Sequence, residues 1–490
     1  MEEQWITSVG IDLGTSTTKF IVSRLRLGRM SSAFSLPRFQ IVERKLVYAS
    51  PIYSTPLKNK EEIDVEQVSR ILREEYEKAQ IKQSDIKSGA VIITGETATK
   101  RNAQQIVHLL ADRSGDFVVA TAGADLEGVL AGKGSGAEAR SRQIQGVIAN
   151  IDIGGGTANV AFFHRGKAIG TVTFHVGGRL IRLDQHGLIH YLSPAIQPWL
   201  QQNGFHLQEK QTIDYQTLEK ITRLLARSMF SWLLGQGEQY HAHLLILGTI
   251  PQEIPAIEEV MISGGVGHLM TQPHPHSLAE VAVYGDMGPL LGPVIKAEAQ
   301  SYPFRLVAAE QTVRATVIGA GMQSTEISGS TVFLKPQLLP LKNIPVLKVE
   351  ITDRHLSDPA VLQEEINRLM QLGKTLFDPT ASPPFAIAMT GISYCSYSAL
   401  QLIAEELSNA FRAHFPSSGL MVVICENDMA KALGQSLSIR CKDQPQVICI
   451  DQVKVEHGDY IDLGEPISHA MIPVIVKTLA FHESSFGVTQ

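Results

Sequence analysis

Short apolar runs alternate with amphipathic stretches along most of the chain, a pattern typical of an α/β protein. In the first third of the chain the apolar runs predict strands at Trp5–Asp12, Lys19–Ser23, Gln40–Tyr53, Gly89–Thr94 and Asp116–Ala122. Val65–Gln80 has apolar residues at the spacing of one helix face, and Asp64 is placed to cap its N-terminus. Further helices are expected at Lys100–Asp112 and from about Asp125.

The pattern of the chain's beginning returns after Gly146. Val147–Asp152 is predicted to be a strand that enters a glycine turn, and Ala158–Phe163 the strand that leaves it. The elements expected next are strand Lys167–His175, helix Leu218–Leu234, strand Val260–Ser263 and the small-residue helix Val313–Ala320. This weak internal duplication indicates two related units.

A third unit is expected after a proline-punctuated linker that follows Leu334. Its predicted elements are strands Val346–Ile351, Phe385–Met389 and Met421–Cys425, helices Ser398–Ala413 and Asp428–Ser436, and a hairpin from Val447–Val455 and Tyr460–Ile461. We therefore divide the chain into residues 1–146, 147–335 and 336–490, which agrees with about three domains for 490 residues.

Composition narrows the class of protein. Apolar residues make up 44% and charged residues 19%, an ordinary globular balance. The net charge is −6, from 43 basic and 49 acidic residues, with no basic block, so no nucleic-acid partner is expected. Neither a secretory signal pattern nor an apolar run of about 18 residues occurs, so we expect a cytoplasmic protein with no membrane partner. The four cysteines, none in a C-x-x-C pair, favour neither a metal cluster nor a disulfide framework.

Two glycine turns carry the candidate chemistry. In each, an apolar strand delivers an aspartate, which is followed by glycine, a hydroxyl residue and a second strand. The glycines let the backbone turn tightly and approach an anion. Exposed N–H groups and hydroxyls can then donate to phosphate oxygens. The phosphate-binding candidates are Gly14, Thr15, Ser16, Thr17, Gly154, Gly155, Gly156 and Thr157.

Asp12 and Asp152 end the strands that enter these two turns. Their carboxylates would repel phosphate unless a cation lay between, and hydrated Mg²⁺ is suited to that place. One such turn is a weak signal, because the same residues form ordinary hairpins. Two copies in matching strand contexts are a stronger one. Neither copy has the P-loop pattern, and the glycine-rich segment Gly132–Gly136, which follows a helix, is predicted to be a loop.

A third motif is the strand that ends in Gly264 and Gly265, where a flat adenine ring could lie against bare backbone. A plain helix-capping turn is the alternative. Together the three motifs resemble the actin-like ATPase superfamily, which includes actin, sugar kinases and DnaK-type chaperones. The resemblance implies a duplicated, ribonuclease H-like α/β fold with ATP and Mg²⁺ between residues 1–146 and 147–335, and an additional C-terminal α/β domain.

By similarity, Asp12 and Asp152 are expected to act in catalysis and to hold Mg²⁺ through water. Glu127 lies in a segment that looks like the family's first connecting helix, where a glutamate often stands near the attacking water. Here a glycine follows it instead of the family's frequent proline. Val317–Gly321, which contains Gly319 as a nucleotide-binding candidate, resembles the second connection.

The whole chain also resembles the reactivating factors of ethanolamine ammonia-lyase. The likeness lies in strings such as Gly95–Lys100, Asn102-Ala103, His175–Arg179, Val317–Ser330 and Val476–Leu479. It implies a chaperone-like factor that uses ATP and Mg²⁺ to release damaged cobalamin from the adenosylcobalamin-dependent lyase in ethanolamine utilization. The lyase and ATP or ADP are the implied partners. ATP hydrolysis, a homodimer and association with a bacterial microcompartment stay open.

The same motifs are compatible with three other classes of protein. A small-molecule kinase would need a base aimed at a substrate hydroxyl, and no further carboxylate motif resembles a sugar-kinase site. A filament-forming relative is disfavoured by the large C-terminal addition. Activators of radical dehydratases carry an iron–sulfur cluster, but no cysteine precedes Cys395.

Several other residues have simpler structural explanations. His274-Pro275-His276 is expected to be unpaired surface, and His175 and His268 to serve packing. Lys19 could reach a phosphate, but it lies on the returning strand, where alternate residues face away from the cleft. Cys425 and Cys449 are expected to be buried hydrophobes.

Overall fold

The computed structural model of the chain describes fifteen ranges of residues. They are 4–14, 17–29, 39–59, 62–82, 85–93, 118–121, 124–248, 254–323, 325–328, 331–378, 380–392, 394–442, 444–455, 459–466 and 471–478. The candidates Thr15 and Ser16, the predicted helix Lys100–Asp112 and the string Gly95–Ala103 lie outside these ranges. Within the described ranges, no helix combines the length and apolar character needed to cross a membrane.

The first lobe is built on a six-stranded sheet. Its strands are β1 (Gln4–Leu13), β2 (Thr17–Arg29), β3 (Phe39–Ala49), β4 (Tyr53–Ser54), β5 (Ile86–Ile93) and β6 (Val118–Thr121). The order is β3-β2-β1-β5-β6, with β4 beside β2. Helix α1 (Val65–Lys78) begins at its predicted cap, because the Asp64 carboxylate accepts a hydrogen bond from the Gln67 N–H. Its buried Val68 and Leu72 belong to the core that covers β1.

The second lobe repeats this arrangement. Its sheet consists of β7 (Val147–Ile153), β8 (Ala158–His164), β9 (Lys167–Phe174), β12 (Ile246–Leu247), β13 (Ile257–Ser263) and β14 (Arg305–Val307). The order β9-β8-β7-β13-β14 corresponds strand for strand to β3-β2-β1-β5-β6. In both sheets the first three strands are antiparallel neighbours and the last two run parallel to the first. The predicted duplicated, ribonuclease H-like fold is thereby confirmed.

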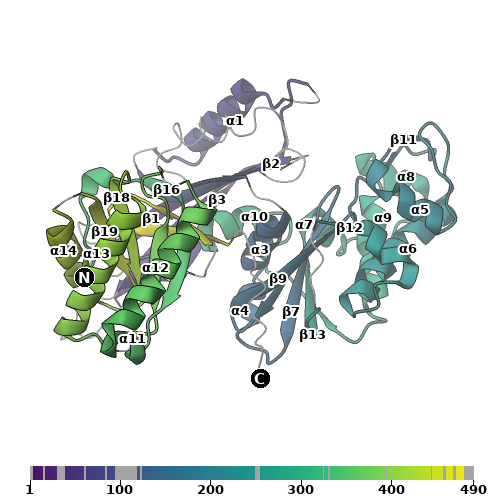
Figure 1. The fold of residues 1–490 in the computed structure, drawn as a ribbon. Helices are drawn as coiled ribbons and strands as arrows, with labels where there is room; N and C mark the ends of the chain where they lie inside the picture. Colours follow the sequence, from purple (N-terminus) through teal and green to yellow (C-terminus); the bar gives the residue numbers. More distant parts are fainter. Residues whose placement is uncertain are drawn as a thin grey trace.

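Helices form the far end of the second lobe (Figure 1). They are α5 (Gln197–Gln202), α6 (Tyr215–Leu233), α8 (Leu278–Val281) and α9 (Gly288–Ala299), with the small hairpin β10 (Ile181–Leu183) and β11 (Ile189–Leu192). Helix α7 (Gly264–Leu269) directly follows β13 and lies nearer the connecting elements (Figure 1). Short 3-10 turns are η3 (Pro194–Ile196), η4 (Gln239–Leu245) and η5 (Ala282–Tyr284). Fully buried Trp199, Phe174 and Phe230 belong to one large core under these helices.

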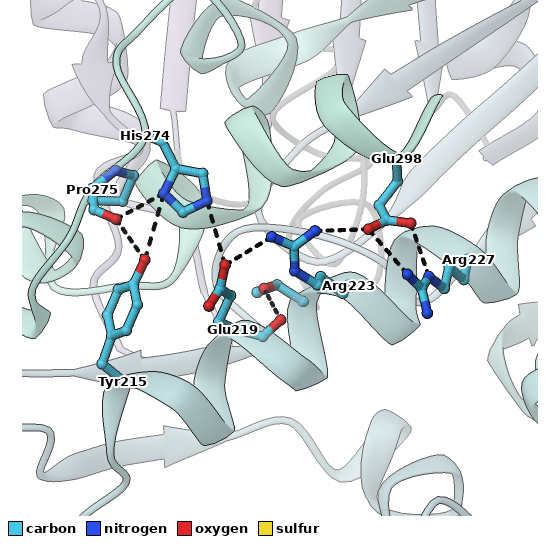
Figure 2. A network of polar contacts seen from close by, with 8 residues as sticks. Tyr215, Glu219, Arg223, Arg227, His274, Pro275 and Glu298 are labelled. Atoms are coloured by element: carbon cyan, nitrogen blue, oxygen red, sulfur yellow. Dashed lines mark hydrogen bonds and ion pairs between the residues drawn. The ribbon is translucent and has the colours of Figure 1, made fainter. Parts of the chain in front are cut away.

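A polar network fastens α6 to α9 and to the loop that contains His274 (Figure 2). The nearly buried Glu298 accepts hydrogen bonds of 2.9 Å from Arg223 and 2.8 Å from Arg227. The imidazole of His274 lies 3.6 Å from the Glu219 carboxylate. The expectation that the His274-Pro275-His276 segment is unpaired surface is therefore wrong for His274, because α6 supplies partners that its sequence neighbours do not show.

Two connecting elements cross between the lobes (Figure 1). The first is α3 (Ala124–Gly134), followed by α4 (Ala137–Arg140); the second is α10 (Ala315–Ile318), continued by the π-helix η6 (Gly319–Gln323). A Cβ on Gly134 would lie 1.8 Å from the Ala315 carbonyl oxygen, and one on Gly319 would lie 1.9 Å from that of Leu130. The predicted loop at Gly132–Gly136 is thus wrong for its first three residues, which are helical. Their glycines allow two backbones to touch rather than allowing a loop.

The third unit contains a seven-stranded sheet in the order β15-β21-β20-β16-β17-β18-β19. Its strands are β15 (Thr325–Ile327), β16 (Leu341–Glu350), β17 (Ala386–Thr390), β18 (Leu420–Cys425), β19 (Gln446–Asp451), β20 (Asp459–Leu463) and β21 (Pro473–Thr478). Its helices are η7 (Pro336–Leu338), α11 (Asp353–Ser357), α12 (Pro359–Leu376), α13 (Tyr397–His414) and α14 (Ala430–Cys441). β16 to β19 are parallel and in sequence order, so α12, α13 and α14 return on one face.

The predicted hairpin between residues 447–455 and 460–461 is wrong. β19 pairs with β18, whereas β20 pairs with β16 and β21 on the other side of the sheet. The free edge of β19 is occupied by Phe333, which forms a bridge with Cys449. Cys425 and Cys449 are buried, as expected. β15 comes from before residue 336, so the third sheet also uses chain that precedes the proposed boundary.

Candidate functional site

The two glycine turns are alike in detail. The Gly14 N–H donates to the Thr17 carbonyl over 2.9 Å, and the Gly154 N–H donates to the Thr157 carbonyl over 3.0 Å. Asp12 pairs with Lys19 across β1 and β2, and Asp152 pairs with Asn159 across β7 and β8. The duplication predicted from the sequence therefore holds at the level of single hydrogen bonds and strand partners.

The first turn is supported from behind by Thr55. Its hydroxyl donates to the Gly14 carbonyl over 2.7 Å and lies 3.2 Å from the Thr18 hydroxyl. Thr17 opens β2 directly after the turn. The backbone at Gly14 is thus held by Thr55.

The second turn is supported by the segment Gly177–Arg179. The Gly178 N–H donates to the Gly154 carbonyl over 3.0 Å, and the Arg179 N–H donates to the Gly155 carbonyl over 2.6 Å. A Cβ on Gly177 would lie 2.4 Å from the Gly155 carbonyl oxygen, so only glycine permits this contact. A Cβ on Gly156 would meet no heavy atom within 4 Å. The turn therefore packs against Gly177–Arg179, whereas its Gly156 is open to a ligand.

Charged side chains converge between the two turns. The Lys19 ammonium group lies 3.2 Å from an Asp12 carboxylate oxygen, with both side chains largely buried. Lys19 therefore faces the cleft and not away from it. The Ser263 hydroxyl donates to Asp152 over 2.6 Å. Glu127, on α3, lies close enough to feel the charges of Asp152 and Asp12 and bonds to Asn159.

Burial in this cluster disfavours ionised carboxylates. Desolvation, and next the negative charges of Asp152 and Asp12, raise the pKa of Glu127 to about 8. Desolvation also raises the pKa of Asp152, against the opposing effects of the Ser263 hydrogen bond and the Lys19 charge. The three carboxyl groups of Asp12, Asp152 and Glu127 can all ionise only if positive charge lies nearby. Lys19 supplies one such charge.

The donor set fits a hydrated divalent cation. Mg²⁺ usually keeps several waters and is held by one or two carboxylates together with substrate phosphates. Asp12 and Asp152 provide two such carboxylates, one from each lobe. Among the residues that the structure describes, no three His, Cys, Asp or Glu side chains are grouped to hold a metal ion by themselves.

The third motif packs on the strand that carries the second turn. Gly264 has a φ of +84°, and a Cβ there would lie 2.3 Å from the Ile153 carbonyl oxygen. Its N–H donates to the Thr312 carbonyl. The next residue, Gly265, has no heavy atom within 4 Å of a Cβ position. The arrangement buries Gly264 and leaves the backbone of Gly265 exposed beside the second turn.

Sequence reasoning missed residues that support these motifs. Ser263, Thr316 and Asn159 all bond to the acidic side chains, and Thr55 and Arg179 to the backbones of the turns. Asn159 could have been found, because it takes the place of Lys19 in the duplicated pattern. Thr55 had no signal, since 41 residues separate it from Gly14. Gly319 lies at the crossing of α3 and α10, where packing alone explains a glycine.

Comparison with known proteins gives one consistent result. A family model described as ethanolamine utilisation protein EutA matches residues 3–482. Proteins named ethanolamine ammonia-lyase reactivase EutA, from Escherichia coli (strain K12) and Salmonella typhimurium (strain LT2), are each 35% identical over 483 residues, covering 98% of this chain and 100% of theirs. Among solved structures, a Ppx/GppA family member from Aquifex aeolicus matches with a TM-score of 0.41 and 13% identity, over 64% of this chain and 97% of its own.

Proposed function

The chain belongs to the family of ethanolamine utilisation protein EutA, and on that premise we propose that it is an ATP-gated reactivase of ethanolamine ammonia-lyase. The nucleotide is proposed to lie between the first two lobes, with its phosphates against both glycine turns and its adenine against Gly264 and Gly265. The observation that carries this is the meeting of Asp12, Lys19, Asp152 and Glu127 between two turns with the same hydrogen-bonded geometry.

Each residue has a proposed task. The backbone N–H groups of Gly155 and Gly156, with the Thr17 and Thr157 hydroxyls, donate to phosphate oxygens. Gly14 and Gly154 shape the turns, because their N–H groups donate to the Thr17 and Thr157 carbonyls. Asp12 and Asp152 orient the water shell of Mg²⁺, which would supply the positive charge that screens the phosphates from the carboxylates. Thr15, Ser16 and Gly319 remain candidates from the sequence pattern.

Glu127 is the proposed base if ATP is hydrolysed. A base must be ionised to accept a proton from water, and a pKa of about 8 keeps most of the carboxyl protonated at neutral pH in the nucleotide-free protein. Ordering positive charge at Asp12 and Asp152 would lower that pKa. Glu127 would therefore become an effective base only when Mg²⁺ is bound at Asp12 and Asp152.

Conformational work follows from the position of the site. A triphosphate that is bound by both turns holds the lobes together, and loss of the terminal phosphate contacts lets them move as hinged bodies. The second connection, η6, is followed within two residues by β15, a strand of the third sheet. Movement at the crossing of α3 and α10 would thus reach the third unit through the chain itself.

The expected outcome of this motion is release of damaged cobalamin from the lyase. ATP can drive it only by favouring one client-bound conformation, since equal affinity for two conformations shifts neither. A homodimer, association with a microcompartment and the division into residues 1–146, 147–335 and 336–490 remain predictions.

The proposal is tested with ethanolamine ammonia-lyase inactivated by cyanocobalamin. Wild-type protein with ATP, Mg²⁺ and fresh adenosylcobalamin should restore lyase activity, and Asp12→Ala or Asp152→Ala should not. Asp378→Ala, which alters an exposed turn carboxylate of the third unit, is the matched control and should behave as the wild type. A non-hydrolysable ATP analogue distinguishes binding from turnover. Recovery in either site variant that equals that of the wild type, or recovery that needs no nucleotide, would contradict the proposal.

A further inference from the structure

An unbroken chain of buried hydrogen bonds leads from Asp152 to the end of the connecting helix α3. The Ser263 hydroxyl donates to Asp152 over 2.6 Å. The Asn150 amide donates to Ser263 over 3.1 Å, and the Ser135 hydroxyl donates to the Asn150 amide oxygen over 2.7 Å. Ser135, Asn150 and Ser263 are completely buried.

These hydrogen bonds all run in one direction, with each side chain donating to the next from Ser135 to Asp152. A serine hydroxyl has one proton, so Ser263 commits its proton to the carboxylate and must accept from Asn150. Ser135 also lies 3.2 Å from the Gly132 carbonyl, but the shorter contact to Asn150 is the stronger one. Bonds that end on a charged acceptor in a low-dielectric interior are strong and reinforce one another. A change in the charge or bonding of Asp152 therefore alters the hydrogen bonds of Ser263, Asn150 and Ser135.

Ser135, the last residue of this hydrogen-bonded series, lies where the two connecting elements cross. Ser135 directly follows Gly134, whose Cα approaches the backbone of Ala315 on α10. The Ser135 carbonyl accepts the Glu310 N–H over 2.9 Å, which ties the same point to the segment leading into α10. Both connections between the lobes thus meet where the hydrogen-bonded chain ends.

Within the described residues, the first lobe has no counterpart of this link at the matching position of β1. The residue that matches Asn150 in the duplicated pattern is Gly10, and a Cβ there would lie 2.7 Å from the Val317 carbonyl oxygen. There the second connection packs directly on the bare strand. A buried amide costs free energy unless it is hydrogen-bonded, so Asn150 is not a neutral replacement for glycine.

We propose that Asn150 is a positioning residue that links the Asp152 carboxylate, through Ser263 and Ser135, to the C-terminal end of α3. When the bonding of Asp152 changes in the nucleotide cycle, the link carries the change to the crossing of the connecting elements. This inference rests on the proposed function, because it requires nucleotide at Asp152.

Hydrogen–deuterium exchange of the full-length protein tests the link. Peptides that cover residues 124–140 are compared with and without saturating ATP and Mg²⁺, and affinity is measured in parallel by calorimetry. In the wild type, ATP should slow exchange at the end of α3. Ser135→Ala should lose most of that difference while its affinity for ATP stays within about threefold of the wild type, because Asp152 keeps Ser263.

Removing Asn150, in the middle of the hydrogen-bonded series, should affect both Asp152 and the end of α3. Asn150→Ala removes the partner that orients Ser263, so it should lose the ATP-dependent difference and also weaken ATP binding by about tenfold. Ser263→Ala provides an independent break and should lose the difference too. Ser228→Ala, an equally buried serine on α6 that bonds to Trp199, is the control and should retain the full difference.

The outcomes distinguish failure of the link from failure of the proposed function. If Ser135→Ala and Ser263→Ala both retain the wild-type response at α3, the link is overturned and the proposed function stands. If the wild type itself binds no ATP, the proposed function fails, and the link fails with it.

Discussion

The ammonium group of Lys19 lies 3.2 Å from the Asp12 carboxylate, on the strand pair that enters and leaves the first glycine turn. The matching positions of the second turn hold Asn159 and Asp152. The duplicated halves therefore share their backbone geometry but differ in charge, and the first half alone brings a cation into the cleft at this position.

Replacing Lys19 by methionine should weaken binding of ATP with Mg²⁺ by roughly 10- to 100-fold, the range expected for losing a hydrogen bond to a charged group. The reason is that Lys19 offsets the carboxylates that would otherwise repel the triphosphate. Calorimetry measures the effect, and Lys220→Met, at an exposed position of α6, is the control. Unchanged or tighter binding would show that Lys19 serves only to neutralise Asp12.

Gly156→Ala should separate binding from folding. No heavy atom lies within 4 Å of the Cβ position, so the substitution should leave the thermal unfolding midpoint unchanged or slightly higher. The added methyl group would stand where a phosphate has to approach, so affinity for ATP should fall by at least about tenfold. Normal affinity in a folded Gly156→Ala protein would place the phosphates elsewhere.

Gly134→Ala should have the opposite profile, with a loss of stability. A Cβ 1.8 Å from the Ala315 carbonyl oxygen forces α3 and α10 apart. Such overpacking costs about 1–3 kcal/mol or more and exceeds the gain of about 1 kcal/mol that alanine brings to a helix. Gly170→Ala, whose Cβ would make an ordinary 3.5 Å contact with Phe162, is the matched control. Equal unfolding midpoints for the two variants would contradict the close crossing.

The stability of the second lobe should depend on pH through Glu259. This buried carboxylate accepts hydrogen bonds of 2.9 Å from Arg140. Arg140 above all, with help from Arg305 and against the effect of burial, holds the pKa of Glu259 below its ordinary value of 4.5. A folded-state pKa below the unfolded one gives stability that is complete above pH 4.5 and is lost as the pH falls through the folded value.

Glu259→Gln should therefore lower the free energy of unfolding by about 1–2 kcal/mol at pH 7, with the deficit shrinking below pH 4.5. Denaturant unfolding at a series of pH values measures it. Glu258→Gln, at the neighbouring exposed position, should differ little from the wild type at any pH. A deficit that stays constant down to pH 3 would show that the Glu259 charge contributes nothing.

Local patterns were enough to predict most elements and the duplicated fold. The aspartate and glycine positions of both turns are set by short-range backbone chemistry. The strands that carry them are marked by apolar residues, which make up five of the seven buried positions of β7. The predicted cap of α1 is confirmed for the same reason, since Asp64 and Gln67 are near neighbours in sequence.

Long-range contacts explain what could not be predicted. Gly134 looks like a loop residue until Ala315 is known to lie against it, and His274 looks unpaired until α6 supplies Glu219. The pairing of β20 with β16 joins strands that are distant in the chain. The link from Asp152 through Asn150 to Ser135 likewise joins residues whose spacing carries no signal.

The central claim is that both glycine turns bind one nucleotide, and calorimetric titration of the full-length protein with ATP in millimolar Mg²⁺ tests it most directly. The account predicts one site per chain, with heat of binding that is lost in Asp12→Ala and equally in Asp152→Ala. No heat for the wild type, or loss in only one of the two variants, would contradict it.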